Sequence, residues 1–150
     1  MVYTAHSVPV SMAESSPYER QLREVCARVN ATLGLPEPVL VYQSRSGPPS
    51  QSWLEPDVGE YIRGTASRKL VVVPIGFLSD HMEVLYDLDT EAAVAAKERG
   101  IGFVRAGTAG THPRFVSGIR EMVQSALVST PGYVCLPDCC KPGAKPARQA

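Results

Sequence analysis

The sequence lacks an excess of charge of either sign, because fifteen lysine and arginine residues balance fifteen aspartate and glutamate residues. Proteins that bind nucleic acid usually carry a basic excess, so no nucleic-acid partner is expected. No uninterrupted apolar run approaches the roughly 20 residues of a transmembrane helix. The first residues, MVYTAHSVPV, have no basic region followed by a long apolar core, as a secretory leader would. We therefore expect no transmembrane segment and a cytoplasmic protein.

The sequence does contain enough apolar material for a core. Apolar residues make up 44% of its 150 residues and charged residues 20%, which is typical of a folded chain. We predict one globular domain over residues 1–130. Residues 131–150 are rich in proline and cysteine, and we predict an irregular, flexible tail there.

Short apolar runs alternate with helical patterns along the chain. This alternation predicts an α/β fold: a Rossmann-like, open, parallel four-stranded sheet with helices on both faces. One strand is apolar throughout rather than alternating, as expected of a central strand covered on both faces. The predicted strands are Val2–His6, Pro38–Gln43, Leu70–Ile75 and Ile101–Arg105.

The first long helix is predicted from its capping residues. Ser16 is the expected N-cap, Pro17 the first helical residue and Glu19 the acidic member of a capping box. Gly34 supplies the end of the helix. Apolar residues at spacings of three and four form its buried face: Leu22, Val25, Cys26, Val29 and Leu33.

Three more helices are predicted. A short one begins at Pro56, after a loop rich in glycine, proline and serine over residues 43–53. A long one covers residues 80–98, and the last covers residues 113–127. Five side chains of the last helix are expected to face inward: Phe115, Ile119, Met122, Val123 and Ala126.

Candidate functional residues lie where the predicted strands end. Ligands of open parallel sheets bind at the carboxyl ends of the strands. His6 ends the first strand, and the loop after the third leads to His81 and Glu83. On the following helix Glu83, Asp87 and Glu91 are four residues apart and form a row of like charges, which costs a few tenths of a kcal/mol per pair.

Two interpretations of this row stay open on spacing alone. An imidazole beside several carboxylates supplies ligands for a divalent metal and groups that accept protons. A wider turn, such as a π-bulge, would align the carboxylates further and is frequent at functional sites. Alternatively, Asp80 and Glu83 only cap the helix or interact favourably with the positive end of its dipole, and His6 is a structural histidine.

Three ordered blocks of the sequence resemble the carboxyl-terminal half of ferrochelatase, in particular of bacterial members with a cysteine-rich tail. They are TAHSVP at residues 4–9, YQSRSGP with WLEPD within 42–57, and VPIGFLSDHMEVLYDLD at 73–89. The likeness extends from Tyr3 to about Leu127. Ferrochelatases are lyases that insert ferrous iron into a porphyrin, protoporphyrin IX or coproporphyrin III, in haem biosynthesis. The resemblance implies this activity, with Fe²⁺ as the substrate metal.

The resemblance also implies roles for the candidate residues. His6 corresponds to the active-site histidine of the family, Glu83 to its acidic partner, and His81 to the histidine two positions before that glutamate. Asp87 and Glu91 correspond to the acidic row that leads away from it, often on a π-helix. Metal insertion removes two pyrrole protons and delivers a divalent ion. We expect His6 to be metal ligand or proton acceptor, with Glu83 as its partner and the row as a relay.

Four residues are candidates for binding the porphyrin, and one of them is His81. Trp53 corresponds to a tryptophan at the cleft of the family, and Tyr42 could line the same apolar slot. Arg45 could pair with a propionate, since a guanidinium matches a carboxylate. Plain packing is the alternative for both aromatic residues, and a solvated loop position is the alternative for Arg45.

Ferrochelatase ordinarily has two similar α/β halves, and the resemblance covers only the second. The other wall of the porphyrin cleft is therefore expected from a homodimer, as in short cobalt and nickel chelatases, or from a separate amino-terminal half. The alternative function is a non-catalytic metal-binding or iron–sulfur module.

The four cysteines are unevenly placed, with three of them close together in the predicted tail. Cys135, Cys139 and Cys140 resemble the carboxyl-terminal ligands of a [2Fe-2S] cluster that several ferrochelatases carry. Cys26 is the remaining candidate for a fourth ligand. Its alternative interpretation is a small buried apolar residue on the first long helix.

Overall fold

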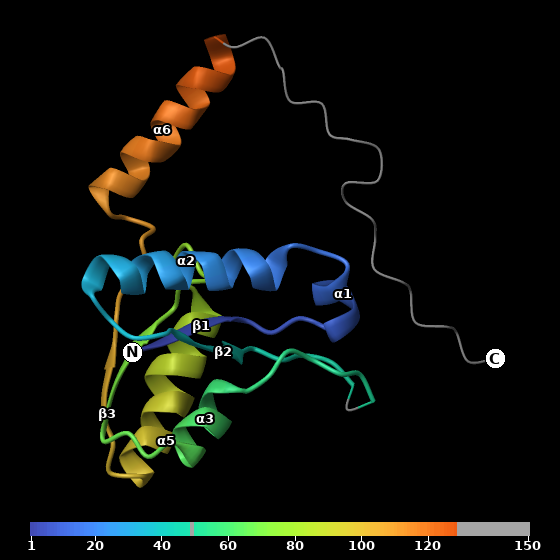
Figure 1. Ribbon diagram of the computed structural model, residues 1–150, viewed down its shortest axis with the longest axis vertical. Coiled ribbons are helices and arrows are strands. Elements are labelled where there is room, and N and C mark those ends of the chain that lie inside the picture. The colour runs from blue at the N-terminus through green and yellow to red at the C-terminus, as the bar shows by residue number, and fades with distance from the viewer. Residues whose placement is uncertain (49, 129–150) are drawn as a thin grey trace, which may run out of the picture.

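The computed structural model describes residues 1–48 and 50–128, and its centre is a parallel sheet (Figure 1). The strands are β1 (Val2–His6), β2 (Val39–Gln43), β3 (Lys69–Val73) and β4 (Gly102–Arg105), in the order β2-β1-β3-β4. All neighbouring pairs are parallel. The predicted open four-stranded parallel sheet is thus confirmed.

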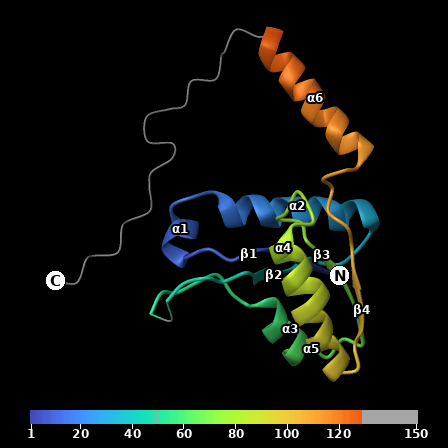
Figure 2. The ribbon, with the colours of Figure 1, turned by 180° about the vertical axis from the view of Figure 1, so that it is seen from behind.

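Helices lie on both faces of the sheet, as predicted, but β3 is not covered on both faces as the sequence predicted, because Val71 is 44% exposed. On one face lies α2 (Tyr18–Leu33), preceded by the short α1 (Val10–Glu14), which the sequence did not indicate. On the other lie α3 (Val58–Gly64) and a continuous helix made of α4 (Met82–Val84), the π-helix η1 (Leu85–Ala92) and α5 (Ala93–Glu98) (Figure 2). Among the described residues, no helix combines the length and the hydropathy needed to cross a membrane.

The sheet separates two apolar clusters. Strand residues alternate between them, so that Val2 packs toward η1 whereas Tyr3 packs toward α2. The larger cluster joins the sheet to α3 and to the helix 82–98, and it contains Val72, Val84 and Leu88, none of which has exposed surface. This cluster fixes the helix 82–98 on the sheet.

The predicted start of the first long helix is wrong by one residue. Its N-cap is Pro17, and no side chain caps it. The Ser16 hydroxyl accepts only a long hydrogen bond of 3.4 Å from the Tyr18 amide, and Glu19 accepts hydrogen bonds from Arg23 instead of closing a capping box. The predicted end is confirmed, because Gly34 has a left-handed conformation with φ of 64°.

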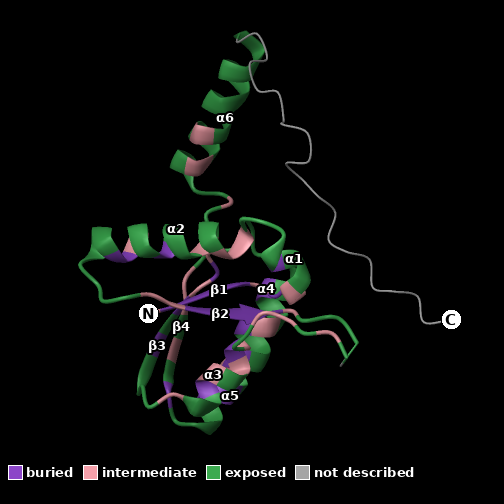
Figure 3. Ribbon diagram, turned by 45° about the vertical axis from the view of Figure 1, so that its right-hand side comes forward, coloured by how far each residue is buried: buried purple, intermediate pink, exposed green. Residues whose placement is uncertain are grey.

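The inward orientation predicted for the last helix is also wrong, except at Phe115, which is half-buried and lines a cavity with Phe77 and Leu78. This helix, α6 (Pro113–Val128), projects from the body of the molecule, and none of its residues is buried (Figures 1 and 3). Ile119 is 41% exposed and Met122 66%. In the loop before α6, Gly110 packs against the Leu78 carbonyl. An apolar stripe shows that a helix has a face to bury, but not what covers that face.

One glycine brings the loop after β3 against β1. The Gly76 amide donates to the Thr4 carbonyl at 3.0 Å. A Cβ atom at Gly76 would lie 2.6 Å from the Cβ atom and 2.8 Å from the Cα atom of Ala5. Only glycine therefore allows this approach, which places Phe77 and the residues after it beside the end of β1.

We expect Gly76→Ala to lower the free energy of unfolding by about 1–3 kcal/mol, the usual cost of overpacking against a backbone that cannot move. Urea denaturation measures this change. Gly64→Ala is the matched control, because a Cβ atom there would meet nothing within 4 Å. Equal stabilities for the two variants would show that the close approach of Gly76 to Ala5 is not a constraint.

Candidate active site at the carboxyl edge of the sheet

His6 is the last residue of β1 and lies beside Gln43 at the carboxyl edge of the sheet. Its Nδ1 atom is 2.5 Å from the Ser7 carbonyl oxygen. A carbonyl only accepts hydrogen bonds, so Nδ1 carries the proton and Nε2 carries the free lone pair of the neutral ring. Histidines that bind metals are commonly held in this way, by a backbone carbonyl on the other nitrogen. His6 is thus oriented with a basic nitrogen available.

The free nitrogen of His6 faces a carboxylate. Nε2 is 3.9 Å from Glu83 Oε2, and the two side chains are 33% and 55% exposed. The backbone at His6 is held in place because the Tyr18 hydroxyl donates to its carbonyl at 2.9 Å. The structure therefore brings together the two residues that the sequence proposed as partners, on the first strand and on the helix after the third.

Two carboxylates of the row, Asp87 and Glu91, lie on a π-helix, and Glu83 lies on α4 just before it. Leu85–Ala92 has π-helical geometry, the wider turn that was considered from the sequence. Asp87 accepts hydrogen bonds from Gln43 Nε2 at 3.2 Å and from the Ser44 hydroxyl. Asp87 and Glu91 then line a polar cavity of about 460 Å³. The other charged side chains of this cavity are Arg45, Asp57, Glu60 and Arg63. Glu83 faces His6, and the two later carboxylates face this adjoining space.

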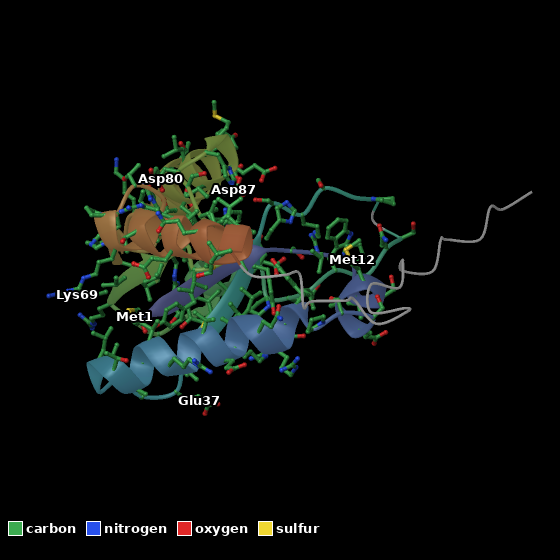
Figure 4. The ribbon with its side chains drawn as sticks, turned by 90° about the horizontal axis from the view of Figure 1, so that it is seen from above. Met1, Met12, Glu37, Lys69, Asp80 and Asp87 are labelled. Carbon is green, nitrogen blue, oxygen red and sulfur yellow. The ribbon has the colours of Figure 1, made fainter. Side chains whose placement is uncertain are left out.

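Two further aspartates near the row form ion pairs with one arginine. Arg105, the last residue of β4, donates to both oxygens of Asp89 at 2.6 and 2.9 Å and to Asp80 at 2.9 Å. Asp80 does not cap the helix, whose N-cap is His81. The capping alternative for Asp80 therefore does not hold, and the acidic residues divide into a paired set and an open row. Asp80 and Asp87 lie on the side of the molecule opposite α2 (Figure 4).

His81 and Phe77 form an aromatic border to the site. The rings of Phe77 and His81 are 5.3 Å apart, edge to face, and Phe77 lies 6.5 Å from the His6 ring. His81 is exposed, whereas Phe77 is buried. The histidine that precedes Glu83 by two positions thus packs on Phe77, whose ring in turn lies near His6.

Besides His81, the other three residues proposed for the porphyrin lie in different settings. Trp53 is partly buried, and its ring packs so closely on Gly47 that a Cβ atom there would lie 2.3 Å from it. Arg45 lines the polar cavity and lies 3.9 Å from a Glu55 oxygen. Tyr42 is 1% exposed and packs in the cluster under α2, which corresponds to the packing alternative.

The described residues hold no ready metal cage. In residues 1–48 and 50–128, no three side chains of histidine, cysteine, aspartate or glutamate gather closely enough to bind an ion. His6 and Glu83 provide one nitrogen and one carboxylate. Such a pair can bind an ion in transit whose other ligands come from water or from a substrate, and it can accept protons.

Cys26 does not fit the role of a cluster ligand. It belongs to α2 and is completely buried where this helix packs on Tyr3, Leu40 and Tyr42 of the sheet. Burial raises the pKa of its thiol from 9.0 to about 11, which disfavours the thiolate that binds metals. Cys135, Cys139 and Cys140 lie outside the described residues.

A sequence comparison identifies the family. The model of the family described as Ferrochelatase matches residues 1–127. The chain belongs to the ferrochelatase family. A ferrochelatase from Rhodopirellula baltica is 50% identical, with 93% of this chain and 44% of that protein covered. A coproporphyrin III ferrochelatase from Propionibacterium freudenreichii is 42% identical, with 93% and 46% covered.

The chain spans about half the length of these ferrochelatases. Among solved structures, a CbiX protein of cobalamin biosynthesis from Marinobacter aquaeolei superposes with a TM-score of 0.56 at 19% identity. The match covers 84% of this chain and 94% of that one. This likeness concerns the fold alone and agrees with the four-stranded parallel sheet.

Sequence reasoning missed the polar residues that hold the helix of this ferrochelatase-family chain. Arg105 and Gln43 each end a strand at the same edge as His6, and that shared position was the available signal. Ser44 follows directly and has φ of 61°. None of the three belongs to a pattern that singles it out before the strand order is known.

The raised pKa of Cys26 predicts a loss of stability in alkali. The unfolded thiol loses its proton near pH 9, whereas the buried thiol retains it to about pH 11. The free energy of unfolding should therefore fall as pH rises from 9 to 11, by an amount on the order of 1–2 kcal/mol. Denaturation of the protein and of Cys26→Ala across this range measures the difference. Parallel curves for the two proteins would contradict the assignment.

Proposed function

We propose that this chain forms the metal-handling wall of a ferrochelatase active site, where ferrous iron is inserted into a porphyrin in haem biosynthesis. The observation that carries the proposal is the free Nε2 of His6, 3.9 Å from Glu83. Glu83 directly precedes the π-helix that carries Asp87 and Glu91. Membership of the ferrochelatase family supports the same reaction.

The reaction assigns a task to each group. The porphyrin loses two pyrrole protons, and the iron ion takes their place between the four ring nitrogens. His6 Nε2 has the lone pair to accept a proton or to bind iron, and Glu83 balances the charge that either event produces. Asp87 and Glu91 supply oxygen ligands along the adjoining cavity, from which iron would approach.

Coproporphyrin III is the first porphyrin to test, and protoporphyrin IX the second. Several relatives carry the name coproporphyrin III ferrochelatase, from Propionibacterium freudenreichii to Mycolicibacterium smegmatis. Arg45 is the proposed partner of a propionate, because its guanidinium lies at the cavity beside the row and a guanidinium pairs well with a carboxylate.

We further propose that an amino-terminal half of the kind found in the longer relatives supplies the second wall. Two apolar surfaces of this chain support a missing partner. One is the face of α6 with Ile119, Met122 and Val123, and the other is the neighbouring pair Val71 and Val104 on the sheet, 44% and 61% exposed. Contiguous exposed apolar surface typically marks a site of association. A homodimer is the competing arrangement.

The tail cysteines Cys135, Cys139 and Cys140 remain the proposed ligands of a [2Fe-2S] cluster, without Cys26. A visible absorption spectrum of anaerobically purified protein tests this proposal, since a colourless protein would contradict it.

The cytoplasmic location also stays a prediction. A metal-binding module without catalysis is the alternative function, and the next experiment distinguishes it from the enzyme.

We expect iron insertion when the chain is combined with the amino-terminal half of the Rhodopirellula baltica relative. His6→Ala and Glu83→Gln should each lower the rate by at least about 100-fold, as loss of an acid–base group does. The porphyrin absorption bands, followed anaerobically with ferrous iron, measure the rate. Glu24→Gln, on the exposed side of α2, is the control. A His6→Ala variant with full activity would refute the assigned chemistry.

The second wall is tested by a charge on α6. Met122→Asp should weaken association with the same amino-terminal half by at least about tenfold, because burying an unpaired charge is costly. Gln124→Asp adds the same charge on the other side of the helix and should have little effect. Analytical ultracentrifugation measures both, and it also shows whether the chain alone forms the competing homodimer.

A further inference from the structure

The helix that carries the carboxylate row is held from two sides by the ends of the outer strands. Consecutive helical side chains point about a quarter-turn apart. Leu88 points into the core and has no exposed surface. Its neighbours therefore point sideways: Asp87 toward Gln43 and Ser44 at the end of β2, and Asp89 toward Arg105 at the end of β4.

Arg105 makes more contacts than a simple ion pair. Its Nε and Nη2 groups donate to the two oxygens of Asp89, and Nη1 donates to Asp80 and to the Ala106 carbonyl. Four of the five N–H donors of the guanidinium are thereby in use. The side chain is only 14% exposed, although both aspartates are about 40% exposed. The planar guanidinium of Arg105 thus links Asp80, which precedes the helix, to Asp89 in the π-helix.

We propose that Arg105 is a positioning residue that sets the direction of the carboxylate row. It joins Asp80, which precedes the helix, and Asp89, which lies within η1, to one fixed point on the sheet. Rotation of the helix about its axis would break one of these contacts. Glu83 lies between the two anchored positions in sequence, so its direction toward His6 depends on both. The catalytic consequence of this inference rests on the proposed function.

Lysine at position 105 separates positioning from charge. An ammonium group is a compact charge without the planar fork, and it cannot make the bidentate contact with Asp89 while reaching Asp80. If Arg105 acts only through its positive charge, Arg105→Lys should behave like the original protein. If it acts as a clamp, Arg105→Lys should resemble Arg105→Met.

The first measurement is hydrogen exchange of the backbone amides in the full chain. In Arg105→Met and Arg105→Lys, the amides of Leu85–Ala92 should exchange at least about tenfold faster, whereas those of α2 should stay within about twofold. Arg28→Met is the matched control, because it removes an ion pair with Glu24 from α2 on the opposite face. Unchanged exchange in Leu85–Ala92 would overturn the clamp, and this result does not depend on activity.

The second measurement divides the kinetic effect between substrates. With the amino-terminal half present, Arg105→Met should raise KM for ferrous iron about tenfold and leave KM for the porphyrin within about twofold. Equal changes in the two KM values would show that Arg105 has only a structural role. Full activity in Arg105→Lys would show that only its charge matters. Either result would overturn the proposal. Absence of insertion in the unsubstituted chain would refute the proposed function instead, and hydrogen exchange would still decide the clamp.

Discussion

The burial of one helix against the sheet is the interaction on which the rest of the site depends. Val84, Leu88 and Ala92 of the helix 82–98 have no exposed surface. Burying a valine or a leucine side chain contributes about 1.5–3 kcal/mol. The partly exposed ion pairs and hydrogen bonds at the sides of the helix contribute less individually, about 0–1 kcal/mol for a pair in water. Apolar packing therefore holds the helix on the sheet, and the polar contacts select which way its carboxylates point.

The parallel sheet explains why groups so distant in sequence meet. All four strands run in one direction, so their carboxyl ends lie at a single edge. β1 contributes His6, β2 contributes Gln43, and β4 contributes Arg105. β3 contributes its following loop, which the close approach of Gly76 to Ala5 brings against β1. The site is therefore a consequence of topology, and no single segment of the chain contains it.

Patterns of local origin were predictable from the sequence, and contacts between distant segments were not. The strands, the left-handed Gly34 and the pairing of His6 with Glu83 followed from periodicity, helix-end chemistry and family resemblance. The Ser16 cap was wrong because the helix begins one residue later, and Glu19 pairs with Arg23 instead of closing a capping box. The orientation of α6 was wrong because periodicity does not identify the surface that covers a helix. Arg105 was missed because its partners become its neighbours only in the folded sheet.

Exposure of the His6–Glu83 pair gives a physical reason for the proposed second wall. The side chains are 33% and 55% exposed, so water surrounds much of the pair. Once His6 has accepted a proton, the two opposite charges about 4 Å apart attract with only about 1 kcal/mol in water, but several-fold more strongly at the lower effective dielectric near a protein surface. Closing a second wall over the porphyrin would exclude that water and strengthen every electrostatic contact in the cleft. In the proposed function, this domain thus positions His6 and Glu83, and the second wall would strengthen the interaction between them.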